Sequence, residues 1–348
     1  MKKTVYASFA ALSLLLSLPL SVQAQETCSA PLIAGGGGGS GAVVGDVHVF
    51  SDGDYLYVDY VLADDWCIGQ AHLQVASSLE GIPMTKKSNP IPGKFDLQDA
   101  VDCEQEVNFA LPLDGLSGDL LVAAHGVVST IIGYDANLAA FAEGLPDVVT
   151  IKVAHPGTAY GEPSYFDVFV SGGSALDGIY DDYCIDTDRT ISPGATYTAN
   201  VYSSYESIPE GLVEQPENLD LLNYILNQSY PGQASVAGGD FTFGDVQRAI
   251  WTLIDDQVST SGLGSWSQAR VDEIIADALA NGEGFSPACG DYVGVIFQPV
   301  SNNQITIAQV TLASVATACA PIYQTETAWP EGTDFPGNNW AMYMECSF

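Results

Sequence analysis

The pattern of hydrophobic and polar positions divides the chain into a strand-rich first part, a helical middle part and a strand-rich end. In the first part, β-branched and aromatic residues gather in runs, some of which alternate with polar residues as half-buried strands do. The strands expected here are 46–50, 55–61, 71–75, 107–113 and 120–128. Ser51–Asp54 separates the first two runs and has the composition of a hairpin turn. We therefore expect an all-β module in this part.

Further along, the apolar residues change from the strand period to a helical one. Strands are expected at 148–153, 165–170 and 196–202, ahead of the change. Three helices follow: one with Asn218 as N-cap, one with Asp245 as N-cap, and one from about Ser267 to Ala280. The second helix carries apolar residues three and four positions apart: Val246, Ala249, Ile250, Leu253 and Ile254. Two more strands, 292–297 and 304–312, close this region.

The predicted fold is mainly β with a helical subdomain. The last segment, 325–343, contains strand and loop residues but is too short to fold alone. We expect it to return to the first module and complete its sheet, which makes residues 25–147 and 321–348 one discontinuous β-sandwich. Residues 148–320 then form an inserted domain. The alternative is a C-terminal extension that packs on the middle domain.

The N-terminal segment has the pattern of a secretory signal. Lys2 and Lys3 precede a mostly apolar stretch, and Val22-Gln23-Ala24 places small residues at a cleavage site. The predicted signal peptide is 1–24, and no membrane span is expected after its removal. The expected location is secreted, extracellular or on the cell surface, with the periplasm as the alternative.

The charge of the chain excludes some partners. Forty-three acidic residues face nine basic ones, a formal net charge of −34. Such a surface repels nucleic acid and anionic membranes. We interpret the acidity as an aid to solubility, with a structural calcium ion as the alternative, because Asp52-Gly53-Asp54 and Asp181-Asp182 are suggestive without matching an EF-hand. The histidines show no metal-ligand spacing, so no cofactor is expected.

Seven cysteines lie in the chain, and an oxidising compartment favours their pairing. The candidate disulfides are Cys28–Cys346, Cys67–Cys103 and Cys289–Cys319, although the sequence alone does not fix the pairing. The odd count leaves one cysteine over. That cysteine could be a buried thiol, an intermolecular disulfide partner, or a residue held in other covalent chemistry.

Two short motifs indicate that other chemistry. One is Tyr183-Cys184, and the other is Val246-Gln247-Arg248-Ala249-Ile250-Trp251. Together they resemble the motifs of the bacterial thioester domains of surface adhesins, whose glutamine motif is Thr-Gln-x-Ala-(Ile/Val)-Trp. The resemblance covers roughly 148–320 and implies a β-sandwich with about three helices. Two features depart from the family: Val246 replaces its threonine, and no wall-anchoring signal is visible.

The resemblance implies that Cys184 and Gln247 form an internal thioester. Cys184 attacks the side-chain carbonyl of Gln247, ammonia leaves, and the bond then captures a nucleophile on a target. We expect a helix N-terminus to stabilise the oxyanion, Trp251 to shield the bond and Ala249 to anchor the helix. Tyr183 and Asp186 complete the expected site. The expected partner is an extracellular protein or glycan carrying a nucleophile, with an amine as the favoured one. Because the bond is used once, the protein is not expected to be an enzyme.

Each of these residues could instead have a purely structural role. Cys184 could be a disulfide partner or a small buried hydrophobe, Gln247 a solvated helix residue and Trp251 a core residue. At the level of function, the alternatives are a structural matrix protein, a non-covalent carbohydrate- or ice-binding β protein, and a secreted cysteine enzyme. An enzyme needs a histidine base, and His155 is the only histidine in the middle region.

Overall fold

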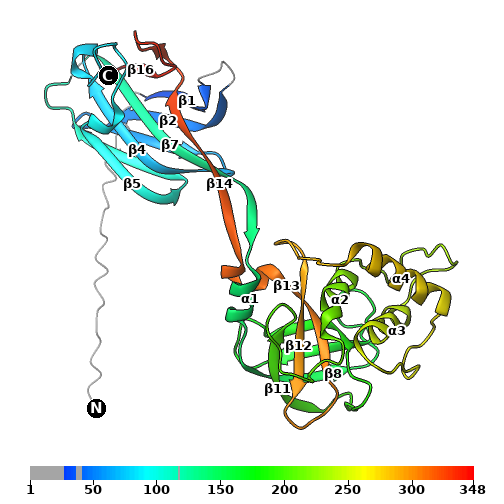
Figure 1. Cartoon of the computed structure of the whole chain (residues 1–348). Coiled ribbons are helices and arrows are strands. Elements are labelled where there is room, and N and C mark those ends of the chain that lie inside the picture. Colours follow the sequence, from blue (N-terminus) through cyan, green and yellow to red (C-terminus); the bar gives the residue numbers. More distant parts are fainter. Residues whose placement is uncertain (1–26, 37–40, 117) are drawn as a thin grey trace, which may run out of the picture. The chain divides into compact units, whose positions relative to one another are not determined.

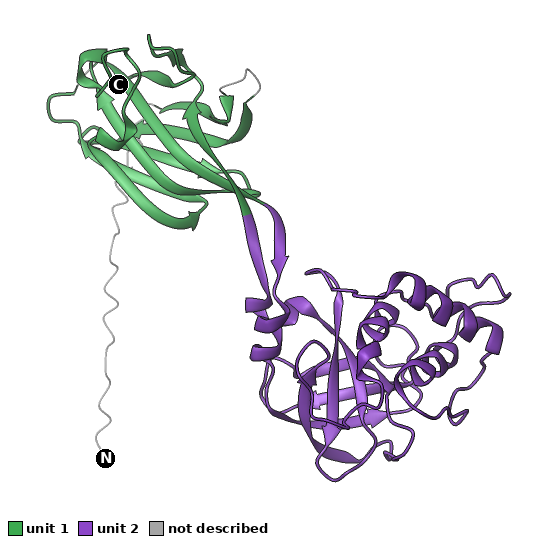
Figure 2. Cartoon of the chain, viewed as in Figure 1, with its two compact units in different colours: residues 1–131, 323–348 green, residues 132–322 purple. Residues whose placement is uncertain are grey.

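The protein divides into two compact units (Figure 2). The computed structural model describes residues 27–36, 41–116 and 118–348, so the predicted signal peptide lies outside the described residues. Unit 1 comprises the chain up to Ile131 together with Tyr323–Phe348, and unit 2 comprises Ile132–Ile322. Relative to the boundary predicted at 147, the structure groups 132–147 with unit 2. Each unit is described separately below.

Unit 1 is an antiparallel β structure (Figure 1). Its strands in chain order are β1 (Thr27–Ala34), β2 (Ala42–Ser51), β3 (Tyr55–Leu62), β4 (Trp66–Ala76), β5 (Leu97–Glu104), β6 (Glu106–Pro112), β7 (Asp119–Ala136), β14 (Cys319–Pro330), β15 (Thr333–Asp334) and β16 (Met342–Ser347). The long strands β7 and β14 continue into unit 2. Alternation is clear in β3, where every second side chain from Leu56 to Leu62 is buried in the core.

The hairpin predicted between the first two runs is confirmed. β2 and β3 pair in antiparallel register, with Ser51 opposite Leu56. Asp52 closes the turn, because its Oδ1 accepts hydrogen bonds from the backbone N–H groups of Asp54 and Tyr55 at 3.0 and 2.8 Å. A short acidic side chain that bonds to its own turn is a common hairpin device.

The C-terminal segment supplies strands to unit 1. β14 lies between β7 and β1, and β16 pairs with the first part of β7. Cys346 of β16 forms a disulfide with Cys28 of β1, which ties the two ends of the described chain together. A second disulfide, Cys67–Cys103, joins β4 to β5.

Unit 2 is built on a closed barrel with the strand order β10-β13-β12-β11-β8-β9. The strands are β8 (Val148–Ala154), β9 (Phe166–Ser171), β10 (Gly178–Cys184), β11 (Thr196–Ser203), β12 (Tyr292–Pro299) and β13 (Thr306–Thr311). The prediction of a mainly β fold with a helical part is confirmed. The two layers expected of a sandwich are here opposite walls of one closed sheet, and closure leaves that sheet without a free edge.

Four α-helices belong to the described part of unit 2: α1 (Leu138–Gly144), α2 (Leu219–Leu226), α3 (Phe243–Ile254) and α4 (Gln268–Asn281). The last three are the predicted ones. Asn218 occupies the N-cap position of α2, but its side chain donates to the carbonyl oxygen of Leu253 instead of capping the helix. The expected capping role was therefore wrong, because the amide ties α2 to α3. Nowhere in the described chain is a helix both long and apolar enough for a membrane span.

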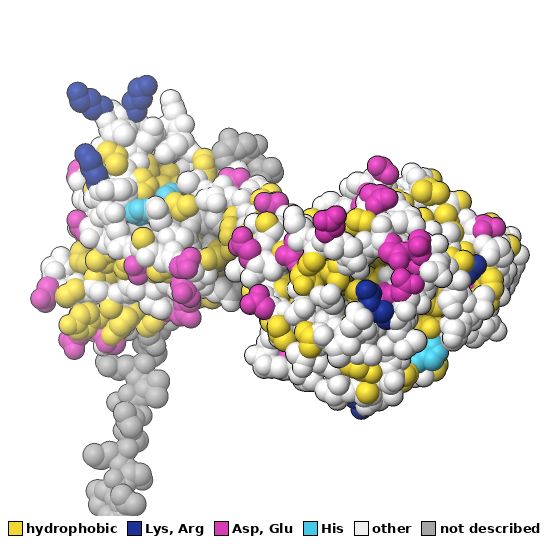
Figure 3. Space-filling model, turned by 60° about the horizontal axis from the view of Figure 1, so that its bottom comes forward, with side chains coloured by type: hydrophobic (Ala, Val, Ile, Leu, Met, Phe, Trp, Pro, Cys, Tyr) yellow, Lys and Arg dark blue, Asp and Glu magenta, His cyan; other side chains and the backbone are white. Residues whose placement is uncertain are grey.

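Acidic side chains are prominent on the surface. In Figure 3, Asp and Glu side chains appear on both units, whereas Lys and Arg side chains are few. An acidic surface of this kind disfavours anionic partners.

Candidate functional site

The structure brings the two motifs into direct contact. Cys184 is the last residue of β10, and Gln247 lies in α3. The backbone N–H of Cys184 donates to Oε1 of Gln247 at 2.8 Å, and Nε2 of Gln247 donates to the carbonyl oxygen of Cys184, also at 2.8 Å. Both residues are 0% exposed. The glutamine is thus a fully buried partner of the cysteine backbone, not a solvated helix residue.

The start of β9 at Phe166 explains why the Cys184 backbone needs a partner in Gln247. β9 pairs with β10 only up to Asp182, which lies opposite Phe166. Before Phe166 the chain turns away, since Ser164 exchanges backbone hydrogen bonds with Gly157. The backbone N–H and C=O of Cys184 therefore have no strand partner on that side. The carboxamide of Gln247 exchanges two hydrogen bonds with them, as an antiparallel strand residue would.

Cys184 is the one cysteine without a disulfide among the described residues. The third disulfide, Cys289–Cys319, completes the pairing of the others. The thiol donates to the carbonyl oxygen of Asp186 at 3.0 Å, and the N–H of Asp186 points at Sγ from 3.5 Å. Burial raises the pKa of the Cys184 thiol to about 12. At neutral pH the sulfur is therefore protonated until a reaction removes its proton.

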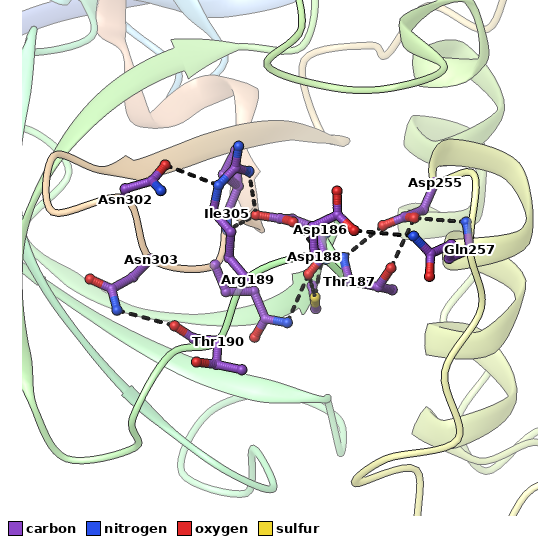
Figure 4. A network of polar contacts seen from close by, with 12 residues as sticks. Asp186, Thr187, Asp188, Arg189, Thr190, Asp255, Gln257, Asn302, Asn303 and Ile305 are labelled. Atoms are coloured by element: carbon purple, nitrogen blue, oxygen red, sulfur yellow. Dashed lines mark hydrogen bonds and ion pairs between the residues drawn. The ribbon is translucent and has the colours of Figure 1, made fainter.

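Asp186 organises the turn that follows Cys184 (Figure 4). Its Oδ2 accepts from Nη1 of Arg189 at 2.7 Å and from the N–H of Ile305 at 3.2 Å, and its Oδ1 accepts from the N–H of Asp188 at 3.1 Å. Side-chain amides add to this, since Nε2 of Gln304 donates to the carbonyl oxygen of Asp186 at 2.8 Å. All these bonds hold the backbone that contacts the thiol, so Asp186 is placed to fix the sulfur.

The same turn is tied to the end of α3. The N–H and hydroxyl of Thr187 donate to the carboxylate of Asp255, the C-cap residue of α3, at 2.7 and 3.0 Å (Figure 4). The Cys184 segment and the Gln247 helix are therefore joined at a second point, which restricts their relative movement. Hydrogen bonds in which a carboxylate is the acceptor are stronger than those between neutral groups.

The start of α3 differs from the prediction. Thr242, not Asp245, is the N-cap, and Asp245 at the third helical position completes a capping box by accepting from the N–H of Thr242 at 2.8 Å. Asp245 also forms an ion pair with Arg270. Gln247 therefore lies a full turn inside the helix, where the N–H groups are already paired. Its Oε1 accepts from the backbone N–H of Cys184 and not from an N–H group at the start of the helix.

Trp251 lies one turn beyond Gln247 and is 1% exposed. Its ring packs edge-on against Tyr165 with centroids 5.5 Å apart, and the Tyr165 hydroxyl donates to the carbonyl oxygen of Ser261. The indole N–H has no hydrogen-bond partner and lies beside the Cys184 sulfur. Trp251 is thus both a core residue and a cover over the thiol.

The other two expected site residues are placed differently. Ala249 is fully buried in the core that joins α3 to the barrel. Tyr183 is buried too, but it alternates with Cys184 along β10, so its side chain lies on the opposite face of the strand. Tyr183 thus contributes to packing on the far side of the barrel wall from the thiol.

Histidine and carboxylate groups were also candidates for chemistry. His155 bonds through Nδ1 to the carbonyl oxygen of Tyr165 at 2.7 Å and makes no hydrogen bond to Cys184. The other histidines include a pair that the sequence did not reveal: Nδ1 of His72 lies 3.2 Å from Nδ1 of His125 across β4 and β7. The signal for this pair is the strand register, which a single sequence does not display.

Neither carboxylate pair expected for calcium converges. Asp52 accepts from its own turn, and Asp181 and Asp182 point to opposite faces of β10. In the described chain, the group with ligand atoms close enough for one ion is Glu214, Asp255 and Asp256. Asp255 already accepts the hydrogen bonds of Thr187 and thereby anchors the turn.

Comparisons with known proteins agree with this part of the chain. Residues 182–280 match the family model described as "Thioester domain", which confirms the resemblance. Solved structures that match include the N-terminal thioester domain of a surface protein from Clostridium perfringens, at 15% identity over 47% of this chain and 99% of that one, with a TM-score of 0.31. Another is the N-terminal thioester domain of the fibronectin-binding protein SfbI from Streptococcus pyogenes, at 17% identity over 47% of this chain and 92% of that one, with a TM-score of 0.28. No curated protein matches.

Proposed function

We propose that Cys184 and Gln247 form an internal thioester, through which the protein attaches covalently to a nucleophile on its target. One observation carries the proposal: the carboxamide of Gln247 is held by both backbone hydrogen bonds of the single unpaired cysteine in the described chain. The match of 182–280 to thioester domains supports the same conclusion.

The geometry suits formation of the bond. Sγ of Cys184 attacks Cδ of Gln247, the C–N bond breaks, and the thiol proton leaves with the nitrogen as ammonia. Negative charge develops on Oε1 during the attack. The N–H of Cys184 is already 2.8 Å from this oxygen, so the donor is in place before the charge appears. Trp251 and the surrounding core exclude the water that would hydrolyse the product.

Capture of a target is a second nucleophilic attack on the same carbon, Cδ of Gln247. An amine of the target attacks the thioester carbon, an amide forms from Cδ of Gln247, and the thiol of Cys184 is released. The protein is consumed as the donor, which makes this a covalent binding protein and not a turnover enzyme. The partner class is an extracellular protein or glycan that carries an amine. The location proposed with it is the secreted or cell-surface one.

Intact mass of the purified protein tests the proposal. The thioester form is lighter by one ammonia than the chain with its three disulfides, and methylamine restores a larger mass while exposing one thiol. Gln247→Glu is the matched control, because a carboxylate of the same shape has no ammonia to lose. A wild-type mass without the ammonia loss, together with a thiol that titrates freely at Cys184, would rule the proposal out.

A further inference from the structure

A hollow on unit 1 has the composition of a binding site and shares no residue with the proposed thioester. It is formed by the end of β15 and the loop that leads to β16, and its volume is about 700 Å³. The lining residues are Asp334, Phe335, Gly337, Asn338, Asn339 and Trp340. Sites for small molecules are concave and combine apolar surface with a few polar groups. Here two aromatic rings stand beside three polar side chains.

The loop around the hollow is fixed to the body of unit 1. Phe335 is buried, and its ring packs edge-on against Trp329 and Tyr343 with centroids 6.0 and 5.0 Å apart. The N–H of Phe335 donates to the carbonyl oxygen of Ala341 at 3.0 Å, which closes the loop. Trp340 packs against the same buried cluster but stays partly exposed. The hollow is therefore formed before any ligand arrives.

These side chains suit a sugar. A sugar ring presents C–H groups on its faces and hydroxyls around its rim, so it pairs with a flat aromatic ring and with planar polar groups. Trp340 supplies the ring. Asn338 and Asn339 are exposed, and each carboxamide can both donate to and accept from a hydroxyl. The exposed carboxylate of Asp334 accepts from hydroxyls only.

The charge beside the hollow is unlike that of the rest of the chain. Lys86, Lys87 and Lys94 are the only basic residues in the described part of unit 1, and they lie together at one end of it (Figure 3). The ion pairs of the described chain both lie in unit 2, so these lysines are not neutralised. No Asp or Glu occurs in 81–95 or in 335–344. This segregation leaves a positive region on an otherwise acidic protein.

The turn that carries two of these lysines touches the loop of the hollow. Gly337 lies directly against Asn89 and Ser88, since a Cβ on Gly337 would be 2.8 Å from the carbonyl oxygen of Ser88. The turn is held by Thr85, whose Oγ1 accepts from the N–H groups of Lys87 and Asn89 at 3.3 and 3.1 Å. The positive charges are thus placed beside the aromatic and amide groups.

We propose that this hollow is a non-covalent binding site for an acidic saccharide, such as an oligomer of uronic acid. Trp340 stacks on a sugar ring, and Asn338 and Asn339 bond to its hydroxyls. Lys86 and Lys87 attract the carboxylate, which favours an acidic saccharide over a neutral one. The site gives unit 1 a recognition role that goes beyond the proposed function and does not depend on it.

Calorimetric titration with tetragalacturonic acid tests the site in the full chain, with Cys184→Ala present to prevent covalent capture. We expect saturable binding, weakened at least about tenfold by Trp340→Ala, because the ring is the main apolar contact in the hollow. The matched control is Tyr55→Ala, which removes an exposed aromatic ring elsewhere in unit 1 and should leave the Kd unchanged. Absence of binding, or equal binding by a folded Trp340→Ala protein, overturns the proposal.

A second pair of variants tests the charge. Replacing both turn lysines, by Lys86→Gln and Lys87→Gln, should weaken binding about fivefold and reduce its dependence on salt. Lys152→Gln in unit 2 is the matched control and should bind as the parent protein does. Equal affinity for neutral tetragalactose overturns the acidic specificity, and equal affinity for a tetraglutamate peptide overturns recognition of a sugar.

Folding and the thioester are separated from the result. If Trp340→Ala does not fold, the double variant Asn338→Ala and Asn339→Ala decides, because both side chains are exposed and outside the core. An unchanged Kd in that variant contradicts the proposal, and a weakened one supports it. Loss of ammonia from the wild-type protein is measured by intact mass without any saccharide, so failure of the thioester and failure of this site are distinct results.

Discussion

The two units treat buried polar groups in different ways. In unit 1, the buried side chains of Gln74 and His125 have hydrogen-bond partners, and two disulfides secure the strands. In unit 2, a thiol, two aspartates of β10, an indole and a hydroxyl are buried with few or no partners. All but one of the buried polar side-chain atoms that lack a partner in the described residues belong to unit 2, Asn89 being the exception. Unsatisfied groups gather where we propose chemistry, at the expense of local stability.

The largest expected effect removes this chemistry completely. Cys184→Ala or Gln247→Ala should abolish covalent incorporation of methylamine, because either change deletes one of the two bonded atoms. Unit 1 should be unaffected, since Cys184 and Gln247 both lie in unit 2 and the two disulfides of unit 1 do not involve them. Incorporation is measured by intact mass and peptide mapping. If Cys184→Ala still incorporated methylamine, at whichever residue the label mapped to, the reaction would not depend on the Cys184–Gln247 pair of unit 2.

Removal of the cover over the thiol should destabilise unit 2 alone. Trp251 is the largest fully buried side chain among the residues that the structure describes, and Trp251→Ala leaves a cavity that costs about 3–5 kcal/mol of unfolding free energy. Thermal or denaturant unfolding should show a shifted transition for unit 2 beside an unchanged one for unit 1. Hydrolysis of the thioester should also become faster. Equal shifts in both transitions would show that the two units unfold together.

Unit 1 should in turn lose stability in acid through His125. Burial lowers the pKa of His125 to about 4, with the neighbouring His72 as a second cause. The unfolded chain binds this proton near pH 6.5 and the folded unit only near pH 4, so stability is full above pH 6.5 and falls as the pH drops towards 4. The slope is at most about 1.4 kcal/mol per pH unit. His125→Asn should flatten this dependence in a pH series of denaturant unfolding curves.

The smallest expected effect concerns the start of α3. Thr242→Ala removes one half of the capping box and should cost unit 2 about 1 kcal/mol. Thioester formation should persist, because the proposed oxyanion donor is the N–H of Cys184 and not the helix end. Thr242→Ser is the control that keeps the hydroxyl. If Thr242→Ala lost the thioester and Thr242→Ser kept it, the helix N-terminus would be shown to stabilise the oxyanion.

The sequence predicted the elements that carry the candidate site better than the contacts between them. The strands and three helices follow from periodicity and residue type, whereas the Gln247 motif follows from the resemblance to thioester domains. The contact between the Gln247 carboxamide and the Cys184 backbone does not, because it depends on β9 beginning only at Phe166, which leaves that backbone without a strand partner. Asp245 looked like a cap because Thr242 and Asp245 are both capping residues, and only the backbone angles separate them. Helix α1 was missed because its seven residues are too few to show a helical repeat of apolar positions.

The Cys184–Gln247 contact has a topological consequence. The two residues are 63 positions apart, so the proposed thioester would close a ring of chain that contains β11, α2 and the first turn of α3. By loop-closure entropy, a cross-link of this span constrains the unfolded chain by about 4 kcal/mol. Capture of an amine would open that ring at the moment an external bond is made. The protein would thus exchange an internal tether for an external one, and its second unit would become easier to unfold once attached.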